Sequence, residues 1–202
     1  VDSSANYCKS QPKIGGKQIV CENWRNLISV GAKPLAITNC LNFGNPENEE
    51  IMGEFAECLE GIKEACEFLN YPVVSGNVSF YNGTNKKNIF PTPVIGGVGI
   101  INKLSSPISH KLKKDKSLLL LIGKTFGHIE QSCFLKENFS ITDGSPPEIN
   151  FFNEKNNGEA VLNLINLGLA NSVHDVSNGG LIVALCEMAM SSNYGIKIEK
   201  PK

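Results

Sequence analysis

The sequence has no excess of charge of either sign. Its 19 Lys and Arg residues nearly balance its 20 Asp and Glu residues, and the formal net charge at pH 7 is −1. This balance argues against a basic nucleic-acid-binding surface. Aromatic residues make up only 7% of the chain, so a row of rings that stacks on single-stranded bases is also not expected. We therefore expect no nucleic-acid partner.

Long apolar runs are also lacking. The longest, residues 93–101 and 118–122, are far too short to span a bilayer. The first ten residues are polar, so no signal peptide is expected. The seven cysteines include no Cys-x-x-Cys pair, which is typical of buried, reduced thiols. The sequence thus predicts a cytoplasmic protein without a membrane partner.

Motifs of the common hydrolases and kinases are missing too. The chain has three histidines, and we find no Ser-His-Asp arrangement, no HExxH and no Walker A motif. No residue is therefore assigned a catalytic role as a general base. What the chain does have is 202 residues with 41% hydrophobic content, which is enough for one large or two small domains.

The apolar patterns predict an α/β (α+β) fold. Glycines at 15–16 and at 31 are expected to bound the first helix, and a lysine-rich polar segment at 104–116 suggests a boundary between a domain at 1–104 and another at 105–202. Residues 82–84 are expected to form a turn. Helices are predicted over residues 18–30, 47–69, 129–137, 150–168 and 180–190, and strands over 34–42, 72–81, 93–101, 118–123, 172–175 and 196–199.

Polar, glycine-bearing segments follow several apolar runs. One spans residues 75–80 and another 174–180, while Asn39 follows the apolar run before it. Such strand ends hold phosphates and divalent ions in many α/β proteins. Two neighbouring ends would bring amides and hydroxyls together over one cleft, although asparagine and glycine also serve ordinary turns.

Oxygen ligands for a hard cation are present at four positions. Glu22 and Asn26 lie four residues apart on a predicted helix and face the same way, but they also fit an exposed polar face. Asp175 lies at a predicted strand end, where it suits either a ligand or a helix N-cap. Asp2 has no comparable context of its own.

Several segments together resemble phosphoribosylformylglycinamidine synthase, in the synthetase subunit of its small multi-subunit form. Leu-Asn-Phe-Gly-Asn-Pro at 41–46 and Ser-Gly-Asn-Val-Ser at 75–79 belong to the pattern of that family. Asp-x-Ser-x-Gly-Gly-Leu at 175–181 is shared across the aminoimidazole-ribonucleotide-synthetase-like superfamily. The resemblance extends over essentially the whole chain.

The resemblance implies an ATP-dependent ligase of purine biosynthesis. It converts formylglycinamide ribonucleotide to formylglycinamidine ribonucleotide with ammonia from glutamine. The chain resembles the second of two homologous halves, in which a barrel-forming N-terminal domain precedes part of a C-terminal α/β domain. The implied partners are a glutaminase subunit, a small accessory subunit and the missing first half of the same subunit. The isolated fragment is expected to be inactive.

The resemblance also assigns roles to residues. Asn39 and Gly76 are implied to bind nucleotide and Ser79 the substrate, while Asn77 is implied to bind Mg²⁺. The family more often has Asp at position 39, so Asn39 should bind more weakly. The Mg²⁺ ligands of a second, auxiliary site that holds ADP or ATP are implied to be Asp2, Glu22, Asn26 and Asp175.

Three other functions remain open at this stage. The chain resembles a catalytic half, but a non-catalytic half that binds nucleotide to stabilise the assembly would carry the same ligands. A sister ATP-using enzyme of the same fold is a further alternative, disfavoured by the segments at 41–46 and 75–79. A plain protein-interaction module would show no magnesium-dependent nucleotide binding.

Overall fold

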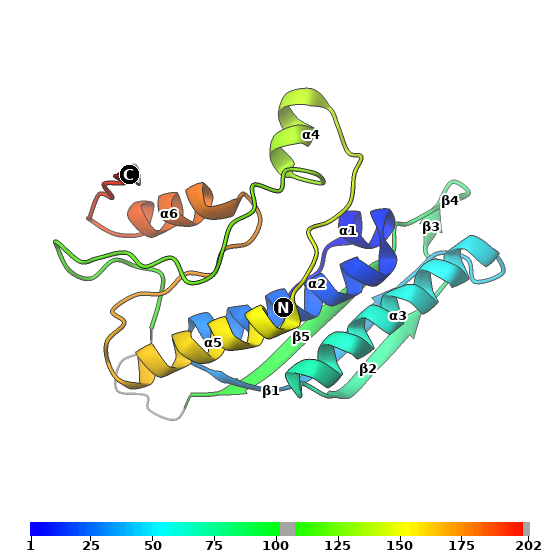
Figure 1. The fold of residues 1–202 in the computed structure, drawn as a ribbon. Helices are drawn as coiled ribbons and strands as arrows, with labels where there is room; N and C mark the ends of the chain where they lie inside the picture. The colour runs from blue at the N-terminus through cyan, green and yellow to red at the C-terminus, as the bar shows by residue number, and fades with distance from the viewer. Residues whose placement is uncertain (102–107, 200–202) are drawn as a thin grey trace.

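The computed structural model describes residues 1–101 and 108–199. Helices and a mixed sheet confirm the predicted α/β class (Figure 1). In chain order the elements are α1 (Ala5–Ser10), α2 (Pro12–Ser29), β1 (Lys33–Asn42), α3 (Glu49–Leu69), β2 (Val73–Ser79), β3 (Gly83–Thr84), β4 (Lys87–Asn88), β5 (Thr92–Ile100), α4 (Cys133–Phe139), α5 (Phe151–Asn166) and α6 (Gly180–Met190).

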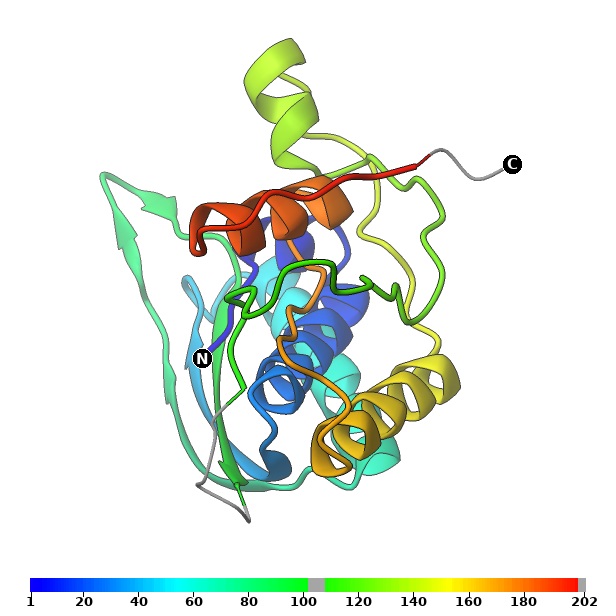
Figure 2. The ribbon, with the colours of Figure 1, turned by 90° about the vertical axis from the view of Figure 1, so that its left-hand side faces the viewer.

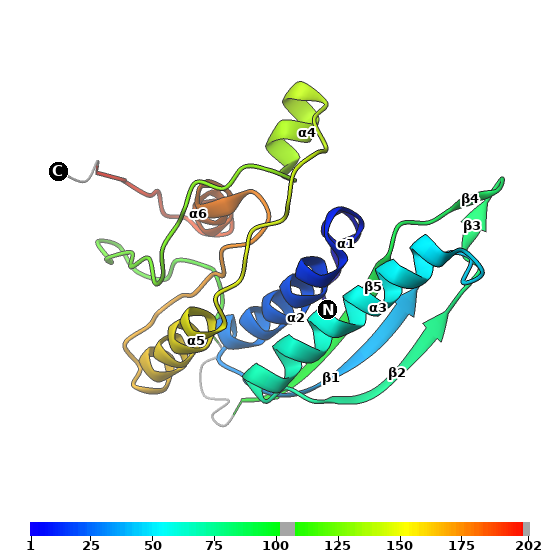
Figure 3. The same ribbon diagram turned by 45° about the vertical axis from the view of Figure 1, so that its right-hand side comes forward.

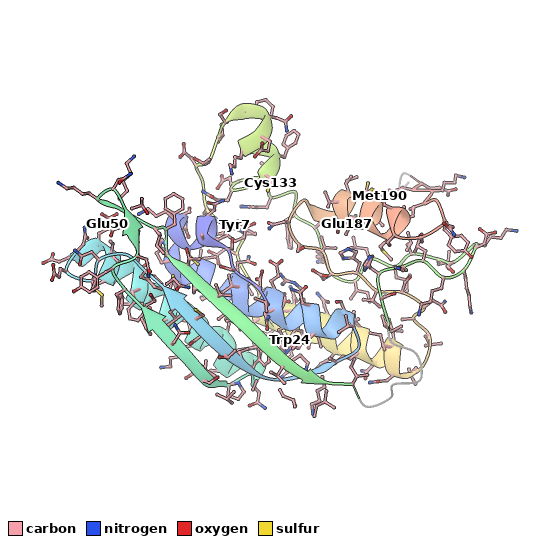
Figure 4. The ribbon with its side chains drawn as sticks, turned by 180° about the vertical axis from the view of Figure 1, so that it is seen from behind. Tyr7, Trp24, Glu50, Cys133, Glu187 and Met190 are labelled. Carbon is pink, nitrogen blue, oxygen red and sulfur yellow. The ribbon has the colours of Figure 1, made fainter. Side chains whose placement is uncertain are left out.

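The main sheet has the strand order β2-β1-β5, with β1 parallel to β2 and antiparallel to β5. Helices α2 and α3 cover one face, and α5 packs over these two helices on the side away from the sheet (Figure 3). Within the described residues no helix covers the opposite face, which is turned toward the viewer in Figure 4. Most of β2 is exposed. One face and one edge of the sheet are therefore open to a further layer of protein.

Close contact between α2 and α3 depends on glycine. A Cβ on Gly16 would lie 2.4 Å from the carbonyl oxygen of Cys58, and one on Gly61 would lie 2.0 Å from that of Lys13. Both contacts are with backbone, which cannot move aside without separating the helices. The two helices and the sheet enclose the core, which includes Ile19, Val20, Ile37, Leu41, Phe43, Cys58, Ile62, Tyr71 and Ile95.

Capping residues explain the limits of the two longest predicted helices. The side chain of Asn48 accepts hydrogen bonds from the N–H groups of Glu50 and Ile51, and the C-cap Asn70 has a φ of 51°. Asn150 accepts from Asn153 N at the start of α5. Asparagine suits both positions because it caps helix N-termini and tolerates the left-handed conformation. The helices predicted over 47–69 and 150–168 are confirmed.

The first helix was predicted too short. Helix α2 begins at Pro12, a residue well suited to the first turn, and the short helix α1 precedes it. Gly15 and Gly16 lie inside α2 rather than before it. Glycine suits these two positions because a Cβ at either would collide with a neighbouring helix. Gly31 does follow the helix with a φ of 80°.

Three predicted strands do not form. Residues 118–123, 172–175 and 196–199 carry no strand in the structure, and Leu118 is 91% exposed. A strand needs a neighbour that completes its hydrogen bonds, and none is paired with these segments in the described part of the chain. The predicted turn at 82–84 is also shifted, since β3 and β4 form a hairpin around Asn85 and Lys86.

The second half of the described chain contacts the first through α5. Phe68 of α3 stacks on Phe151 with ring centroids 5.3 Å apart, and a Cβ on Gly158 would lie 2.2 Å from the ring of Trp24.

The predicted boundary at 104–105 lies outside the described residues. In the part that the structure describes, no helix is long and apolar enough to cross a membrane.

Candidate functional site

Three carboxylates from distant parts of the sequence converge at one place. Asp2 lies before α1 and is fixed by two backbone hydrogen bonds with Ile95 of β5, at 2.8 and 2.9 Å. Glu22 projects from α2, and Asp175 lies in the segment that leads to α6. Each of the three is partly buried. We refer to Asp2, Glu22 and Asp175 as the carboxylate cluster.

Asp2 and Asp175 both act electrostatically on Glu22. Burial, together with the charges of Asp2 and Asp175, raises the pKa of Glu22 to about 7. Arg25 and a hydrogen bond with Ser177 oppose these effects without cancelling them. Burial also raises the pKa of Asp2, and the charge of Asp175 again contributes. The folded chain therefore concentrates negative charge that it does not fully compensate.

The carboxylates of the cluster are suitable ligands for a hard cation, but they are not arranged as a complete metal site. Carboxylate oxygens are the ligands that Mg²⁺ prefers, and Asp2 Oδ2 is buried without a hydrogen-bond partner among the residues that the structure describes. Yet within residues 1–101 and 108–199 no group of three His, Cys, Asp or Glu side chains is placed so that it could hold a metal ion. The side chain of Asn26, one turn after Glu22, has no hydrogen bond to the cluster among residues 1–101 and 108–199; its backbone oxygen accepts from Ser29 Oγ.

A second group of candidate residues lies on β1 and β2. Asn39 pairs with Gly76 across the two parallel strands, and a Cβ on Gly76 would lie 1.8 Å from Asn39 Oδ1. The amide of Asn39 therefore rests directly on the glycine backbone. Any side chain at position 76 would displace it.

Asn77 and Ser79 lie on the opposite face of the sheet. Successive side chains of a strand alternate between faces, and in the register Asn77 pairs with Cys40 and Ser79 with Asn42. Asn82 Nδ2 contacts Ser79 Oγ at 3.1 Å. The expectation that these strand ends share one cleft is thus wrong in one respect: Asn39 and Gly76 face the helices, whereas Asn77 and Ser79 face the open side.

A groove of about 650 Å³ lies beside Asn39. Its wall is the second half of α3, including Leu59, Lys63 and Glu67, and its end is formed by Tyr71 to Val73. Asn39, one of the predicted nucleotide residues, lines this groove on the helix side. Its lining mixes apolar and charged side chains.

The sequence reasoning missed two residues beside the carboxylate cluster. Arg25 of α2 donates through Nη1 to Glu154 Oε1 of α5 at 2.7 Å. Arg25 follows Glu22 by three residues, a spacing that places both on one side of a helix, so the sequence held a signal for it. Glu154 is 129 residues away, and no local pattern indicates that contact.

His174 also lies beside the cluster, next to Asp175. Its Nδ1 lies 2.7 Å from the backbone oxygen of Asp175, and its Nε2 lies 3.0 Å from Glu187 Oε2. Its ring centroid is 5.4 Å from that of His110. These contacts fix the backbone from which Asp175 projects. Glu187, labelled in Figure 4, belongs to α6.

Comparison with known families gives two matches in chain order. Residues 1–101 match the N-terminal domain of AIR synthase related proteins, and residues 115–202 match the C-terminal domain. A curated relative from Pelagibacter ubique, named phosphoribosylformylglycinamidine synthase subunit PurL, is 58% identical over 99% of this chain. The chain spans 27% of the length of that relative.

Solved structures give weaker likenesses. PurL of T. maritima complexed with ATP is 41% identical over 48% of this chain and 17% of that chain, with a TM-score of 0.46. A chain of a HypE–HypF complex has a TM-score of 0.56 and 19% identity, over 88% of this chain and 55% of that chain. The second likeness concerns the fold alone.

Proposed function

Since the chain belongs to the AIR synthase related protein family, we propose that it is part of an ATP-dependent ligase, phosphoribosylformylglycinamidine synthase. The PurL relative from Pelagibacter ubique supports this assignment through its 58% identity over almost the whole chain. The observation that carries the proposal within the structure is the convergence of Asp2, Glu22 and Asp175 from three distant segments.

In the proposed reaction, ATP phosphorylates the amide oxygen of formylglycinamide ribonucleotide, and ammonia then displaces phosphate. Asn39 and Gly76 contribute to nucleotide binding from the helix side of β1 and β2, where the amide of Asn39 lies against the backbone of Gly76. Ser79 contributes a hydroxyl to the substrate. Asn77, exposed on the open face, contributes an amide oxygen to a magnesium ion. Mg²⁺, when bound, offsets negative charge on the transferred phosphoryl group.

The carboxylate cluster is proposed as the core of a second, auxiliary site that holds Mg²⁺ with ADP or ATP. Asp2, Glu22 and Asp175 supply carboxylates, and Asn26 is the neighbouring amide on α2. A Mg²⁺ ion at this site would take carboxylate oxygens from these residues and would keep several of its own waters, as Mg²⁺ commonly does. This site need not take part in turnover, which keeps the stabilising role as a second candidate.

The complete enzyme is proposed to contain more than this chain. A glutaminase subunit, a small accessory subunit and the first half of the same subunit would supply ammonia and the rest of the active site. The open face and the exposed edge at β2 are consistent with further protein there. All seven cysteines are free thiols, which fits the proposed cytoplasmic location.

The Glu22→Ala substitution in the full-length protein separates the two candidate roles. If the cluster belongs to the reaction, ligase turnover with Mg-ATP, formylglycinamide ribonucleotide and ammonia falls together with nucleotide binding. If the cluster is auxiliary, turnover persists while the melting temperature in Mg-ADP drops. A full-length protein that never forms formylglycinamidine ribonucleotide with its partner subunits would disprove the proposed function.

A further inference from the structure

Asn82 joins the ends of the two parallel strands β1 and β2. Its backbone N–H donates to the oxygen of Phe43 at 3.2 Å, and its side-chain Nδ2 donates to the same oxygen at 3.0 Å. Nδ2 also donates to the backbone oxygen of Ser79 at 3.0 Å. Because backbone oxygens can only accept, these contacts fix which way the amide of Asn82 faces. One side chain therefore holds both the residue that follows β1 and the last residue of β2.

The same amide lies against the hydroxyl group of Ser79. Asn82 Nδ2 is 3.1 Å from Ser79 Oγ, and Asn82 Oδ1 is 3.3 Å from it. Among the residues that the structure describes, no other side chain forms a hydrogen bond with this hydroxyl. In the first contact the amide donates and the hydroxyl keeps its own hydrogen, whereas in the second the hydroxyl donates over a longer distance. Ser79 can thus give its hydrogen to another acceptor while Nδ2 still holds Oγ in place.

Aromatic rings anchor the backbone around Ser79 in the core. Phe80 follows Ser79 in the chain, and its ring packs edge-on against Phe55 of α3 with centroids 5.2 Å apart. Phe55 packs in turn against Phe43, with centroids 5.1 Å apart. Phe43 is only 1% exposed. The backbone oxygens that accept from Asn82 therefore belong to a closely packed part of the fold.

We propose that Asn82 is a positioning residue, which holds the hydroxyl of Ser79 so that it donates its hydrogen to an oxygen atom of the substrate. This inference rests on the proposed function, in which Ser79 contacts formylglycinamide ribonucleotide. That molecule offers carbonyl, hydroxyl and phosphate oxygens as acceptors. Asn82 need not touch the substrate, because it acts through Ser79. A hydroxyl without this support would have to be ordered when the substrate binds, and that ordering costs free energy.

Asn88 offers a matched comparison in the same hairpin. The hairpin of β3 and β4 projects from the end of the main sheet (Figure 2). Asn82 O accepts from Ile89 N at 3.1 Å, and Asn88 Oδ1 accepts from Asn45 N at 2.9 Å. Unlike Asn82, Asn88 forms no hydrogen bond with Ser79 in the described part of the chain. Loss of either side chain should loosen the hairpin, whereas only loss of Asn82 should affect the serine.

The test compares steady-state kinetics of the full-length protein and its variants with formylglycinamide ribonucleotide, Mg-ATP and ammonium. Asn82→Ala should raise the KM for formylglycinamide ribonucleotide roughly threefold to tenfold, which corresponds to one neutral hydrogen bond. The KM for ATP and kcat should stay close to the wild-type values, because the lost contact contributes to the binding of one substrate. Asn88→Ala should lower the melting temperature without changing either KM.

Ser79→Ala shows whether Asn82 acts through the serine. This variant should raise the same KM, and adding Asn82→Ala to it should cause no further rise. A purely structural role for Asn82 predicts an equal effect with and without the serine hydroxyl. Asn82→Ser is the second variant if Asn82→Ala does not fold. Serine donates one hydrogen where the amide donates two, so it can bind a backbone oxygen but not the Ser79 hydroxyl as well.

The outcomes separate the inference from the proposed function. An unchanged KM for formylglycinamide ribonucleotide in the Asn82 variants, or an equal rise with and without the Ser79 hydroxyl, would overturn the inference while leaving the ligase function intact. An unchanged KM in Ser79→Ala would overturn the role of Ser79 and the inference with it. A wild-type protein that forms no product with its partner subunits would instead overturn the proposed function itself, and with it the inference.

Discussion

At the scale of the single residue, burial is the main cause of the raised pKa of Glu22. A glutamate on a surface ionises near pH 4.5, whereas Glu22 does so near pH 7 because its carboxylate loses water and faces two other acids. The folded state therefore binds a proton more tightly than the unfolded state. Stability from this group falls as the pH rises from about 4.5 through about 7, and the full cost is present above that range.

Glu22→Gln should consequently stabilise the chain at high pH. In EDTA at pH 8 we expect a gain of about 1–2 kcal/mol, after allowance for solvent screening of a partly exposed side chain. At about pH 3.5 the variant and the wild type should unfold nearly alike, because Glu22 is then protonated in most molecules of both the folded and the unfolded wild type. Urea unfolding at the two pH values measures the difference. An equal effect of the substitution at both values would contradict the account.

Asn23 and Tyr71 form the buried polar contact of the core. Tyr71 Oη donates to Asn23 Oδ1 at 2.8 Å, and Asn23 Nδ2 donates to the oxygen of Ile95 at 3.2 Å. Tyr71→Phe should cost about 1–2 kcal/mol, because it leaves Asn23 Oδ1 buried without a donor. Tyr81→Phe is the control, since Tyr81 is exposed. Equal stability of the two variants in denaturant unfolding would argue against this contact.

The residues of the site were predictable to different degrees. Asp2 has no local signal, and only the resemblance pointed to it, yet it lies in the cluster beside Glu22. Arg25 was detectable from its spacing to Glu22. The pairing of Arg25 with Glu154 was not, because it depends on how α5 packs against α2, and that packing is set by contacts such as Trp24 on Gly158.

At the scale of the element, periodic apolar residues predicted helices well and isolated strands poorly. Helix α3 was found within two residues of its limits because one face is apolar along its whole length. Strands β1, β2 and β5 were also found, and they pair with each other. The run at 118–123 has the composition of a strand, but a strand also needs a partner, which composition does not provide.

Two glycines of the same helix offer a matched test of the packing between α2 and α3. A Cβ on Gly61 would meet the carbonyl of Lys13, whereas no neighbouring atom of the described chain lies within 4 Å of one on Gly53. Gly53→Ala should stabilise the chain by about 0.5–1 kcal/mol, because alanine favours helix. Gly61→Ala should destabilise it by about 1–3 kcal/mol, because the helices must separate.

Thermal unfolding of both variants measures these opposite effects. If Gly61→Ala proved as stable as Gly53→Ala, the close contact between α2 and α3 would be wrong.

At the scale of the whole molecule, the open face of the sheet and the exposed β2 distinguish this chain from a self-contained domain. Val74 is 68% exposed and Val98 is 57% exposed. Together with the 27% share of its PurL relative, this supports the proposal that the active site includes protein beyond this chain.

We therefore expect the purified 202-residue chain to show no synthase turnover. The assay supplies formylglycinamide ribonucleotide, Mg-ATP and ammonium, and it detects formylglycinamidine ribonucleotide. The full-length protein serves as the positive control. Product formation by the chain alone would show that its residues suffice for catalysis.

The convergence of Asp2, Glu22 and Asp175 around a metal-bound nucleotide is most directly tested by crystallography of the full-length protein with Mn²⁺ and ADP. Mn²⁺ replaces Mg²⁺ in sites of oxygen ligands and scatters anomalously. We predict an anomalous peak between the three carboxylates, with the phosphates of ADP beside it. Three carboxylates that point to separate places, or a Mn²⁺ ion held only by other residues, would contradict the account.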